Sequence, residues 1–197
     1  MRLGILGGTF DPVHNGHLAF AEAARKACGL DRVWLMPACV PVYKRNQKVT
    51  SEDHRLAMCR LAAETNPYFE ASDLEMKRGG DTYTADTLRE VRAKLDPQDE
   101  IFFLVGADVA LTVPKWRESD VVAKLAHIVV ANRPGTTWPC GITPESLDGR
   151  FRVTLVDTSP LDISSTAIRD EIARGHDVYD LAPAAVCDYI VRNNLYR

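Results

Sequence analysis

Residues 3–17 read LGILGGTFDPVHNGH, and this stretch decides the fold. The apolar run Leu3–Leu6 has the length of a buried strand and ends in the pair Gly7-Gly8. A helical pattern of apolar residues follows over residues 16–28. We therefore expect a strand, a glycine-rich turn and a helix, which together form the first unit of an alternating fold.

The same alternation continues along the chain. Further apolar runs predict strands at 33–36, 68–72, 101–105, 127–131 and 151–156. Amphipathic segments predict helices that open at the capping sequence 50–53 or lie at 84–95, 116–125, 164–174 and 183–192. Polar or glycine- and proline-rich segments predict loops at 37–47, 77–81 and 133–149. This order predicts an α/β fold: a Rossmann-like, doubly wound, mostly parallel sheet with helices on both faces and a helical C-terminus.

Length and composition bound the class of protein. A chain of 197 residues fits one domain, spanning 1–197, with a sizeable core. Apolar residues make up 46% and charged residues 26%, which excludes disorder as the main state. The net charge of −3 argues against a generally basic surface, so we expect no nucleic-acid partner. These numbers leave the oligomeric state open, a homo-oligomer included.

The sequence also bears on compartment. No apolar run approaches the roughly 18 residues of a membrane span, and no signal-peptide pattern follows Met1, so we expect no membrane partner. The five cysteines are odd in number and form no C-x-x-C pair. A disulfide framework and a structural zinc site are therefore disfavoured, and a reducing cytoplasm fits best. Most of these cysteines lie in apolar stretches, which is typical of small core residues.

The turn after the first strand carries the strongest chemical signal. Gly7 and Gly8 allow a ligand to approach the backbone closely. The start of the following helix points free N–H groups at whatever binds there, which favours a phosphate. His14 and His17 are three residues apart and can share one side of this helix entrance. We expect an anion site that also donates protons; a tight turn with two incidental histidines, or a metal site with few carboxylates nearby, are the alternatives.

A second anion signal lies near the C-terminus. Ile163-Ser164-Ser165-Thr166 places three hydroxyl groups before or at the start of a helix, and Arg169 lies one turn further. Hydroxyls, free N–H groups and a guanidinium then converge, which suits a polyphosphate. Taken alone, the segment reads better as an ordinary capped helix, because Ser and Thr are preferred caps. Beside the first signal, we favour phosphate binding.

Other strand ends hold weaker candidates. Lys44, in a loop after the second strand, either reaches an anion or is a solvated charge. The helix start at Tyr83-Thr84 offers a third anion site, and Asp108 could accept hydrogen bonds from ribose hydroxyls. Trp116 either stacks on a planar ring or belongs to the core. Ligands bind at the carboxyl ends of parallel strands where the strand order reverses, so we expect the chemistry there.

Together these residues resemble the nucleotidyltransferase superfamily with a G-x-F-D-x-x-H-x-G-H signature, and more closely the bacterial nicotinate-nucleotide adenylyltransferases. The resemblance runs in order over essentially the whole chain. The matching segments are 7–18, 78–88, 105–116, 133–135, 163–169 and 189–196. One loop departs from the family pattern. Where the family commonly has Pro-Pro-His-Lys, this chain has Pro41-Val42-Tyr43-Lys44, which keeps the lysine and changes its neighbour.

The resemblance implies transfer of an adenylyl group from ATP to nicotinate mononucleotide, with Mg²⁺, giving deamido-NAD and pyrophosphate. It also implies roles by position. The catalytic residues would be His14, His17 and Arg169. The ATP-binding residues would be Gly7, Gly8, Thr9, Phe10, Gly106, Asp108, Ile163, Ser164, Ser165 and Thr166. The residues that bind nicotinate mononucleotide would be Lys44, Tyr83, Thr84, Trp116 and Arg133.

The chemistry of the implied reaction agrees with the residues present. The attacking phosphate has a second pKa of about 6 and is largely an anion at neutral pH, so neither a strong base nor a covalent nucleophile is needed. The site must align two anions and neutralise charge on the leaving pyrophosphate. We therefore expect His14 and His17 to act mainly as electrostatic and hydrogen-bond donors. A nearby phosphate favours the imidazolium form, and the helix dipole opposes it.

Three alternatives remain open at this point. The acceptor could instead be nicotinamide mononucleotide or phosphopantetheine, although segment 78–88 argues against the latter. The chain could be a nucleotide-binding sensor without catalysis, against which both histidines and Arg169 argue. It could also be a fragment related to the synthetases that charge tRNA, for which it is short and lacks a basic surplus.

Overall fold

The computed structural model describes residues 1–39, 49–132, 147–158 and 163–197. A six-stranded sheet has the order β3-β2-β1-β4-β5-β6, and each neighbouring pair is parallel. The strands are β1 Arg2–Gly8, β2 Arg32–Pro37, β3 Phe69–Ala71, β4 Glu100–Gly106, β5 His127–Asn132 and β6 Val153–Asp157. The predicted α/β, doubly wound, Rossmann-like sheet is confirmed, and it is parallel throughout these strands.

The helices follow the predicted order with some differences. They are α1 Asn15–Cys28, α2 Glu52–Ala63, α3 Leu74–Arg78, α4 Thr84–Arg92, α5 Ala107–Ala110, α6 Ser119–Leu125, α7 Ser165–Ala173 and α8 Ala184–Arg192, with a 3-10 turn, η2, over Val113–Lys115. The prediction of a loop over 77–81 was wrong at its start, because residues 77 and 78 end α3. Helices as short as α3 and α5 show no readable period. The helix expected from residue 116 begins at Ser119, because Trp116 has an extended backbone.

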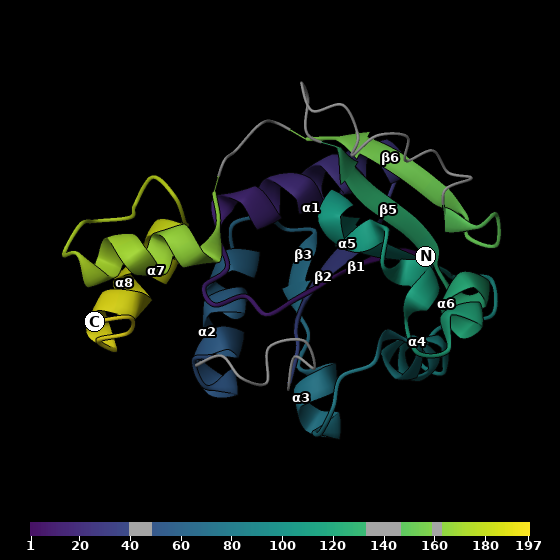
Figure 1. Cartoon of the computed structure of the whole chain (residues 1–197), viewed down its shortest axis with the longest axis horizontal. Coiled ribbons are helices and arrows are strands. Elements are labelled where there is room, and N and C mark those ends of the chain that lie inside the picture. The colour runs from purple at the N-terminus through teal and green to yellow at the C-terminus, as the bar shows by residue number, and fades with distance from the viewer. Residues whose placement is uncertain (40–48, 133–146, 159–162) are drawn as a thin grey trace.

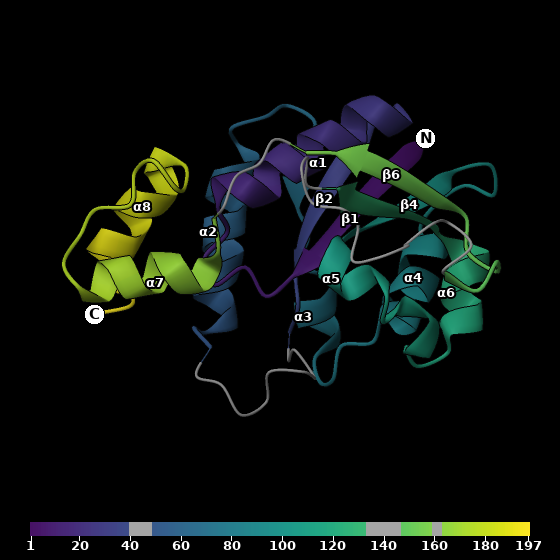
Figure 2. The same ribbon diagram turned by 45° about the horizontal axis from the view of Figure 1, so that its top comes forward.

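The helices cover both faces of the sheet (Figures 1 and 2). On one face, α1, α2, α7 and α8 pack on strand residues such as Leu6 and Leu104. On the other face, α3, α4, α5 and α6 pack on residues such as Ile5 and Phe103. Neighbouring residues of one strand therefore enter opposite clusters, as the two-residue period of a strand requires. We call these the first and the second face.

The strand order reverses at β1. Leu6 of β1 pairs with Leu35 of β2 on one side and with Leu104 of β4 on the other. The carboxyl ends of β1 and β4 therefore lie next to each other, and open α/β sheets bind ligands in this crevice. Gly8 ends β1 and Gly106 ends β4. The glycine-rich turn and the segment near Asp108 are thus placed at the same edge of the sheet.

Three cysteines confirm the prediction of small core residues. Cys28, Cys59 and Cys187 are free and buried in the cluster on the first face. Cys39 is free and half-exposed, and Cys140 lies outside the described residues. Across the part of the chain that the structure describes, no helix is both long enough and apolar enough to cross a membrane.

Candidate active site

The loop from β1 to α1 leaves the sheet along a buried path. Phe10 is 2% exposed and has a φ of 50°, in the left-handed region that costs a non-glycine residue about 1 kcal/mol or more. Its ring fills the space beside Gly8, where an added Cβ would lie 3.1 Å from Phe10 Cζ. The missing side chain of Gly8 therefore lets the loop fold onto the sheet. Phe10 belongs to the core, which leaves its backbone as the part that can reach a ligand.

His14 and His17 lie face to face where α1 begins. Their ring centroids are 3.6 Å apart with an interplanar angle of 25°, as the three-residue spacing predicts. His14 is the N-cap of α1, and its backbone N–H donates to Nδ1 of His17 over 3.2 Å. Nδ1 of His17 is thus an acceptor, so the neutral ring carries its proton on Nε2. This tautomer leaves His17 with an N–H donor on the ring side opposite the His14 amide.

Burial controls the charge of His14. The side chain is 6% exposed, and burial lowers its pKa from the ordinary value to about 4. Its Nδ1 is buried without a hydrogen-bond partner among the described residues. Gly16 makes room for this ring, since a Cβ there would lie 3.1 Å from Nδ1. His14 is therefore neutral at pH 7 in this structure. The sequence-based expectation considered only a phosphate and the helix dipole, and burial is a third effect on the pKa.

The hydroxyl groups at the start of α7 have different partners. Ser164 is the N-cap, and its Oγ accepts the N–H of Ala167 over 3.1 Å, so the capping role applies to this residue. Ser165 Oγ donates to the carbonyl of Pro12 over 2.9 Å. Thr166 is exposed next to them. The predicted hydroxyl cluster thus caps α7 and ties this helix to the β1–α1 loop.

Arg169 joins the two predicted phosphate signals. Its Nη1 donates to the carbonyl of Asp11 over 2.8 Å, and its Nη2 contacts Thr166 Oγ1 at 3.3 Å. Ile163 lies nearby, since its Cβ is 3.8 Å from the position of a Cβ on Gly16. The first turns of α1 and α7 therefore meet, as Figures 1 and 2 show. This arrangement places two helix N-termini, two imidazoles and a guanidinium together, which favours a polyphosphate.

The end of β4 contributes a carboxylate to the same edge. Gly106 ends the strand, and α5 begins directly after it. Asp108 is exposed and folds back over the glycine, because a Cβ on Gly106 would lie 2.7 Å from its Oδ1. The register of β1 with β4 places this carboxylate beside the glycine-rich turn.

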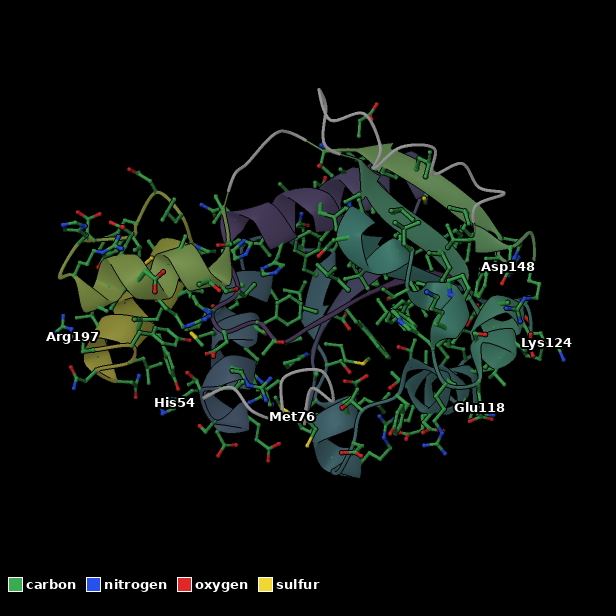
Figure 3. All side chains as sticks on the ribbon, viewed as in Figure 1. His54, Met76, Glu118, Lys124, Asp148 and Arg197 are labelled. Atoms are coloured by element: carbon green, nitrogen blue, oxygen red, sulfur yellow. The ribbon has the colours of Figure 1, made fainter. Side chains whose placement is uncertain are left out.

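The segment around Tyr83 comes from the second face. Tyr83 is the N-cap of α4, because its backbone is extended with φ −119° and ψ 131°. The guanidinium of Arg117 lies 4.5 Å from the centroid of the Tyr83 ring. Glu118, labelled in Figure 3, forms an ion pair with Arg89 of α4. These contacts bring the segment that follows Trp116 onto the start of α4.

Trp116 is partly core and partly exposed. Its Nε1 donates to Thr112 Oγ1 over 2.9 Å, and its ring meets Phe103 edge to face with centroids 6.0 Å apart. Phe103 also approaches β1, since its Cζ is 3.4 Å from the position of a Cβ on Gly7. Phe103 therefore lies between the glycine-rich turn and the indole. Lys44 and Arg133 lie outside the described residues, so their roles stay predictions.

Sequence analysis missed Arg55 of α2, which is 2% exposed. Its guanidinium donates four hydrogen bonds of 2.7–3.0 Å to the carbonyls of Thr9, Ala38, Cys39 and Thr50. These carbonyls belong to the loop after β1, the segment after β2 and the segment before α2. Burial lowers the pKa of Arg55. A basic residue in an amphipathic helix reads as a solvated charge, and no local pattern marks it as buried.

Glu75 of α3 is a second residue that sequence analysis missed. It is 6% exposed, and burial raises its pKa to about 7. Thr87 Oγ1 donates to its Oε1 over 2.6 Å, and Arg78 Nη2 donates to the same hydroxyl over 3.1 Å. Arg78 Nη1 also donates to Glu90 over 2.9 Å. This network fastens α3 to α4 next to Tyr83, the cap of α4.

The sequence of the chain matches a known family over most of its length. The Cytidylyltransferase-like family matches residues 5–171. A probable nicotinate-nucleotide adenylyltransferase of Dehalococcoides mccartyi is 37% identical, with 100% of this chain and 97% of the relative covered. Proteins of the same description from Moorella thermoacetica and Roseiflexus sp. are 39% and 41% identical, and the matches cover 100% and 99% of this chain and 92% and 98% of those relatives.

Solved structures share the fold. The Plasmodium falciparum nicotinic acid mononucleotide adenylyltransferase complexed with NaAD superposes with a TM-score of 0.78 at 21% identity, covering 99% of this chain and 97% of that one. The same enzyme complexed with APC gives a TM-score of 0.77 at 21% identity, covering 99% and 96%. Sequence relatives span the whole chain, and these structures share its topology. The chain therefore belongs to the cytidylyltransferase-like family and, within it, to the nicotinate-nucleotide adenylyltransferases.

Proposed function

We propose that this chain transfers the adenylyl group of ATP to nicotinate mononucleotide, forming deamido-NAD and pyrophosphate in NAD biosynthesis. The observation that carries the proposal is the meeting of α1 and α7 at the carboxyl end of β1. There the stacked pair His14 and His17 lies with Arg169, whose guanidinium bonds the loop between β1 and α1. The names of full-length relatives support the same reaction.

In this proposal the phosphates of ATP lie between the starts of α1 and α7. The backbone at Gly8 and Thr9, the Nε2–H of His17 and the guanidinium of Arg169 would donate hydrogen bonds to them. A guanidinium has five N–H groups, and the bonds to Asp11 and Thr166 use part of them. Ser165 and Thr166 line the start of α7, where the helix dipole favours negative charge.

The adenosine would lie at the end of β4. The exposed carboxylate of Asp108, folded over Gly106, is an acceptor for ribose hydroxyls. Among the described residues, no group of three or more His, Cys, Asp or Glu side chains is arranged to hold a metal ion. We propose that Mg²⁺ is carried mainly by the substrate phosphates and water, with Asp108 as a neighbouring carboxylate. The ion would neutralise part of the negative charge of the ATP phosphates.

The nicotinate ring would lie on the Trp116 side of Phe103. The start of α4 at Tyr83-Thr84 offers N–H donors and the positive end of a helix dipole to the ring carboxylate. A carboxylate gains more from that environment than a neutral amide, which is our reason for preferring the nicotinate nucleotide. Lys44 remains the proposed ligand of the mononucleotide phosphate, and Arg133 remains a proposed residue of the mononucleotide site.

The proposed chemical step is an in-line displacement without a covalent intermediate. The mononucleotide phosphate is already largely anionic at pH 7, so it attacks the α-phosphorus of ATP without a general base. The protein aligns the two substrates and stabilises charge on the leaving pyrophosphate. A neutral His14 serves as a donor in the resting site, and an adjacent phosphate raises its pKa.

Pyrophosphate release tests the proposal. The purified chain is mixed with ATP, Mg²⁺ and one acceptor: nicotinate mononucleotide, nicotinamide mononucleotide or phosphopantetheine. We expect release mainly with the nicotinate nucleotide. Preference for another acceptor would overturn the pocket at Tyr83-Thr84 and leave the adenylyl-transfer site standing. ATP binding without pyrophosphate release with any acceptor would indicate a nucleotide-binding sensor.

We also propose that residues 1–197 act as one domain. From the cysteine usage, we propose that the protein works in the cytoplasm.

A further inference from the structure

The segment after α8 folds back onto the β1–α1 loop. Tyr196 O–H donates to Asp11 Oδ1 over 2.7 Å, although the two residues are 185 positions apart. Burial and the nearby carboxylate raise the pKa of Tyr196, so its hydroxyl keeps the proton at pH 7. Arg197, labelled in Figure 3, lies beside α8, on the same side of the molecule as His54 of α2.

Asp11 is held from both its side chain and its backbone. It is 5% exposed, and its Oδ2 accepts the backbone N–H of Thr50 over 3.2 Å. Its own carbonyl accepts the guanidinium of Arg169 over 2.8 Å. One residue therefore connects Tyr196 to Arg169. The two hydrogen bonds to its carboxylate fix the position of Asp11, and the carbonyl of the same residue holds the Arg169 guanidinium.

The hydroxyl of Tyr196 is not what packs α8. The helix is held by Val186, Cys187 and Ile190, which are buried in the cluster on the first face. The ring of Tyr196 packs against the same cluster. Apolar burial therefore anchors this part of the chain, and the hydroxyl serves Asp11 in addition.

We propose that Tyr196 is a positioning residue for adenylyl transfer, which acts through Asp11 to place Arg169 against the ATP phosphates. The inference rests on the proposed ATP site between α1 and α7. Phosphoryl transfer depends on alignment, and a displacement of about 1 Å costs about 100-fold in rate. A smaller displacement, after loss of one hydrogen bond, gives a smaller effect.

The test compares Y196F with a matched control, Y189F. Tyr189 is also half-buried in the C-terminal part, and its hydroxyl contacts His54 Nδ1 at 2.9 Å, away from Asp11. We expect Y196F to lower kcat/KM for ATP about 10-fold and to raise the KM for ATP, with the KM for the acceptor unchanged. Y189F should leave all three constants unchanged. A loss of folded protein alone would lower apparent kcat and leave both KM values as they were, so the KM for ATP separates positioning from folding.

A double-mutant cycle with R169A completes the test. If Tyr196 acts through Arg169, Y196F causes no further loss in the R169A background. Full activity of R169A would overturn the proposed ATP site itself. An impaired R169A together with an unimpaired Y196F, or with strictly additive losses, would overturn only the role of Tyr196.

Discussion

His14 and His17 share one location and differ in how the protein holds them. His14 is buried and neutral, and Gly16 has no side chain that would displace its ring. His17 is half-exposed, and the His14 amide fixes its tautomer with Nε2 as the donor. The two imidazoles therefore have separate tasks at the residue scale. We propose that His17 contacts the phosphate. His14 shapes the entrance of the helix and acts as a second hydrogen-bond donor.

The variant H17A tests the donor role. Removing one preorganised donor from a transition state costs about 100-fold in kcat, and we expect a loss of that size in pyrophosphate release. His176 provides the control, because it is exposed after α7 and pairs with Glu171 over 2.6 Å. H176A should retain full kcat. A turnover of H17A close to that of the unaltered chain would disprove the donor role.

The pKa of His14 predicts a pH dependence of stability. The pKa is about 4 in the folded chain and near 6.5 when unfolded, so the unfolded chain binds more protons between these values. The contribution of His14 to the free energy of unfolding is therefore fully present above pH 6.5. It is lost as the pH falls from 6.5 through about 4. Between pH 7 and pH 5 this loss is about 2 kcal/mol.

Urea unfolding of the unaltered chain and of H14Q, at pH 7 and pH 5, measures this contribution. The stability difference between the two chains should shift by about 2 kcal/mol in favour of H14Q at pH 5. Glu75 has the opposite sign. Its pKa is raised to about 7, so its contribution is present below about 4.5 and is lost as pH rises through 7. In the unaltered chain the His14 and Glu75 contributions to stability partly cancel, which is why H14Q is needed. An equal stability difference between the two chains at both pH values would contradict the His14 assignment.

At the scale of elements, Arg55 joins segments that belong to different parts of the sheet. Its guanidinium donates hydrogen bonds to carbonyls of three segments: the loop after β1, the segment after β2 and the segment before α2. Backbone carbonyls need hydrogen-bond donors, and four of them accept from this one buried side chain. Arg55 therefore holds together three segments beside the proposed active site, and one of them is the loop that contains the glycine-rich turn.

The variant R55M removes all four hydrogen bonds while keeping an apolar stem. We expect the free energy of unfolding to fall by about 3 kcal/mol, since four hydrogen bonds to a charged donor are lost. R60M is the control on the same helix, because Arg60 is exposed and its contact with Asp73 is 3.6 Å long. It should cost under about 1 kcal/mol. Equal midpoints of urea unfolding for R55M and R60M would refute this account of Arg55.

At the scale of the whole molecule, the proposed ATP phosphate site and the proposed nicotinate pocket lie on opposite faces of the sheet. The proposed ATP phosphate site uses α1 and α7 on the first face, and the proposed nicotinate pocket uses α4 and the segment before α6 on the second. Phe103 of β4 connects them, since it approaches Gly7 and contacts Trp116. The reaction then takes place across the edge of the sheet, where β1 and β4 end side by side.

This division predicts that damage to the contact between α3 and α4, away from Asp108, affects the acceptor alone. T87V removes the hydroxyl shared by Glu75 and Arg78 and loosens α3 from α4. We expect the KM for nicotinate mononucleotide to rise several-fold, by about 3- to 10-fold for one lost hydrogen bond, while the KM for ATP stays the same. T65V removes a hydroxyl bonded to Ala62 on α2 and serves as the control. A rise in the KM for ATP in T87V would show that the two faces are not independent.

The sequence by itself determined the elements and the principal motifs, because both are local. Short apolar runs predicted every strand of the described sheet, and helical spacing of apolar residues predicted the longer helices. The spacing of His14 and His17 predicted their pairing. Short helices such as α3 were missed, since five residues hold no full period. The segments around Gly8, Asp108 and Arg169 were predicted to bind ligands because glycines, caps and charges stand next to strand ends.

Only the tertiary structure decided which charges are buried and which distant residues meet. The burial of Arg55 and Glu75, the low pKa of His14 and the contact of Tyr196 with Asp11 arise from elements that are far apart in the sequence. Burial depends on what packs against a side chain, and the desolvation that shifts a pKa follows from that packing. No window of neighbouring residues contains this information. The position of the β1–α1 loop after a strand end could therefore be predicted from the sequence, and the contacts that hold the loop could not.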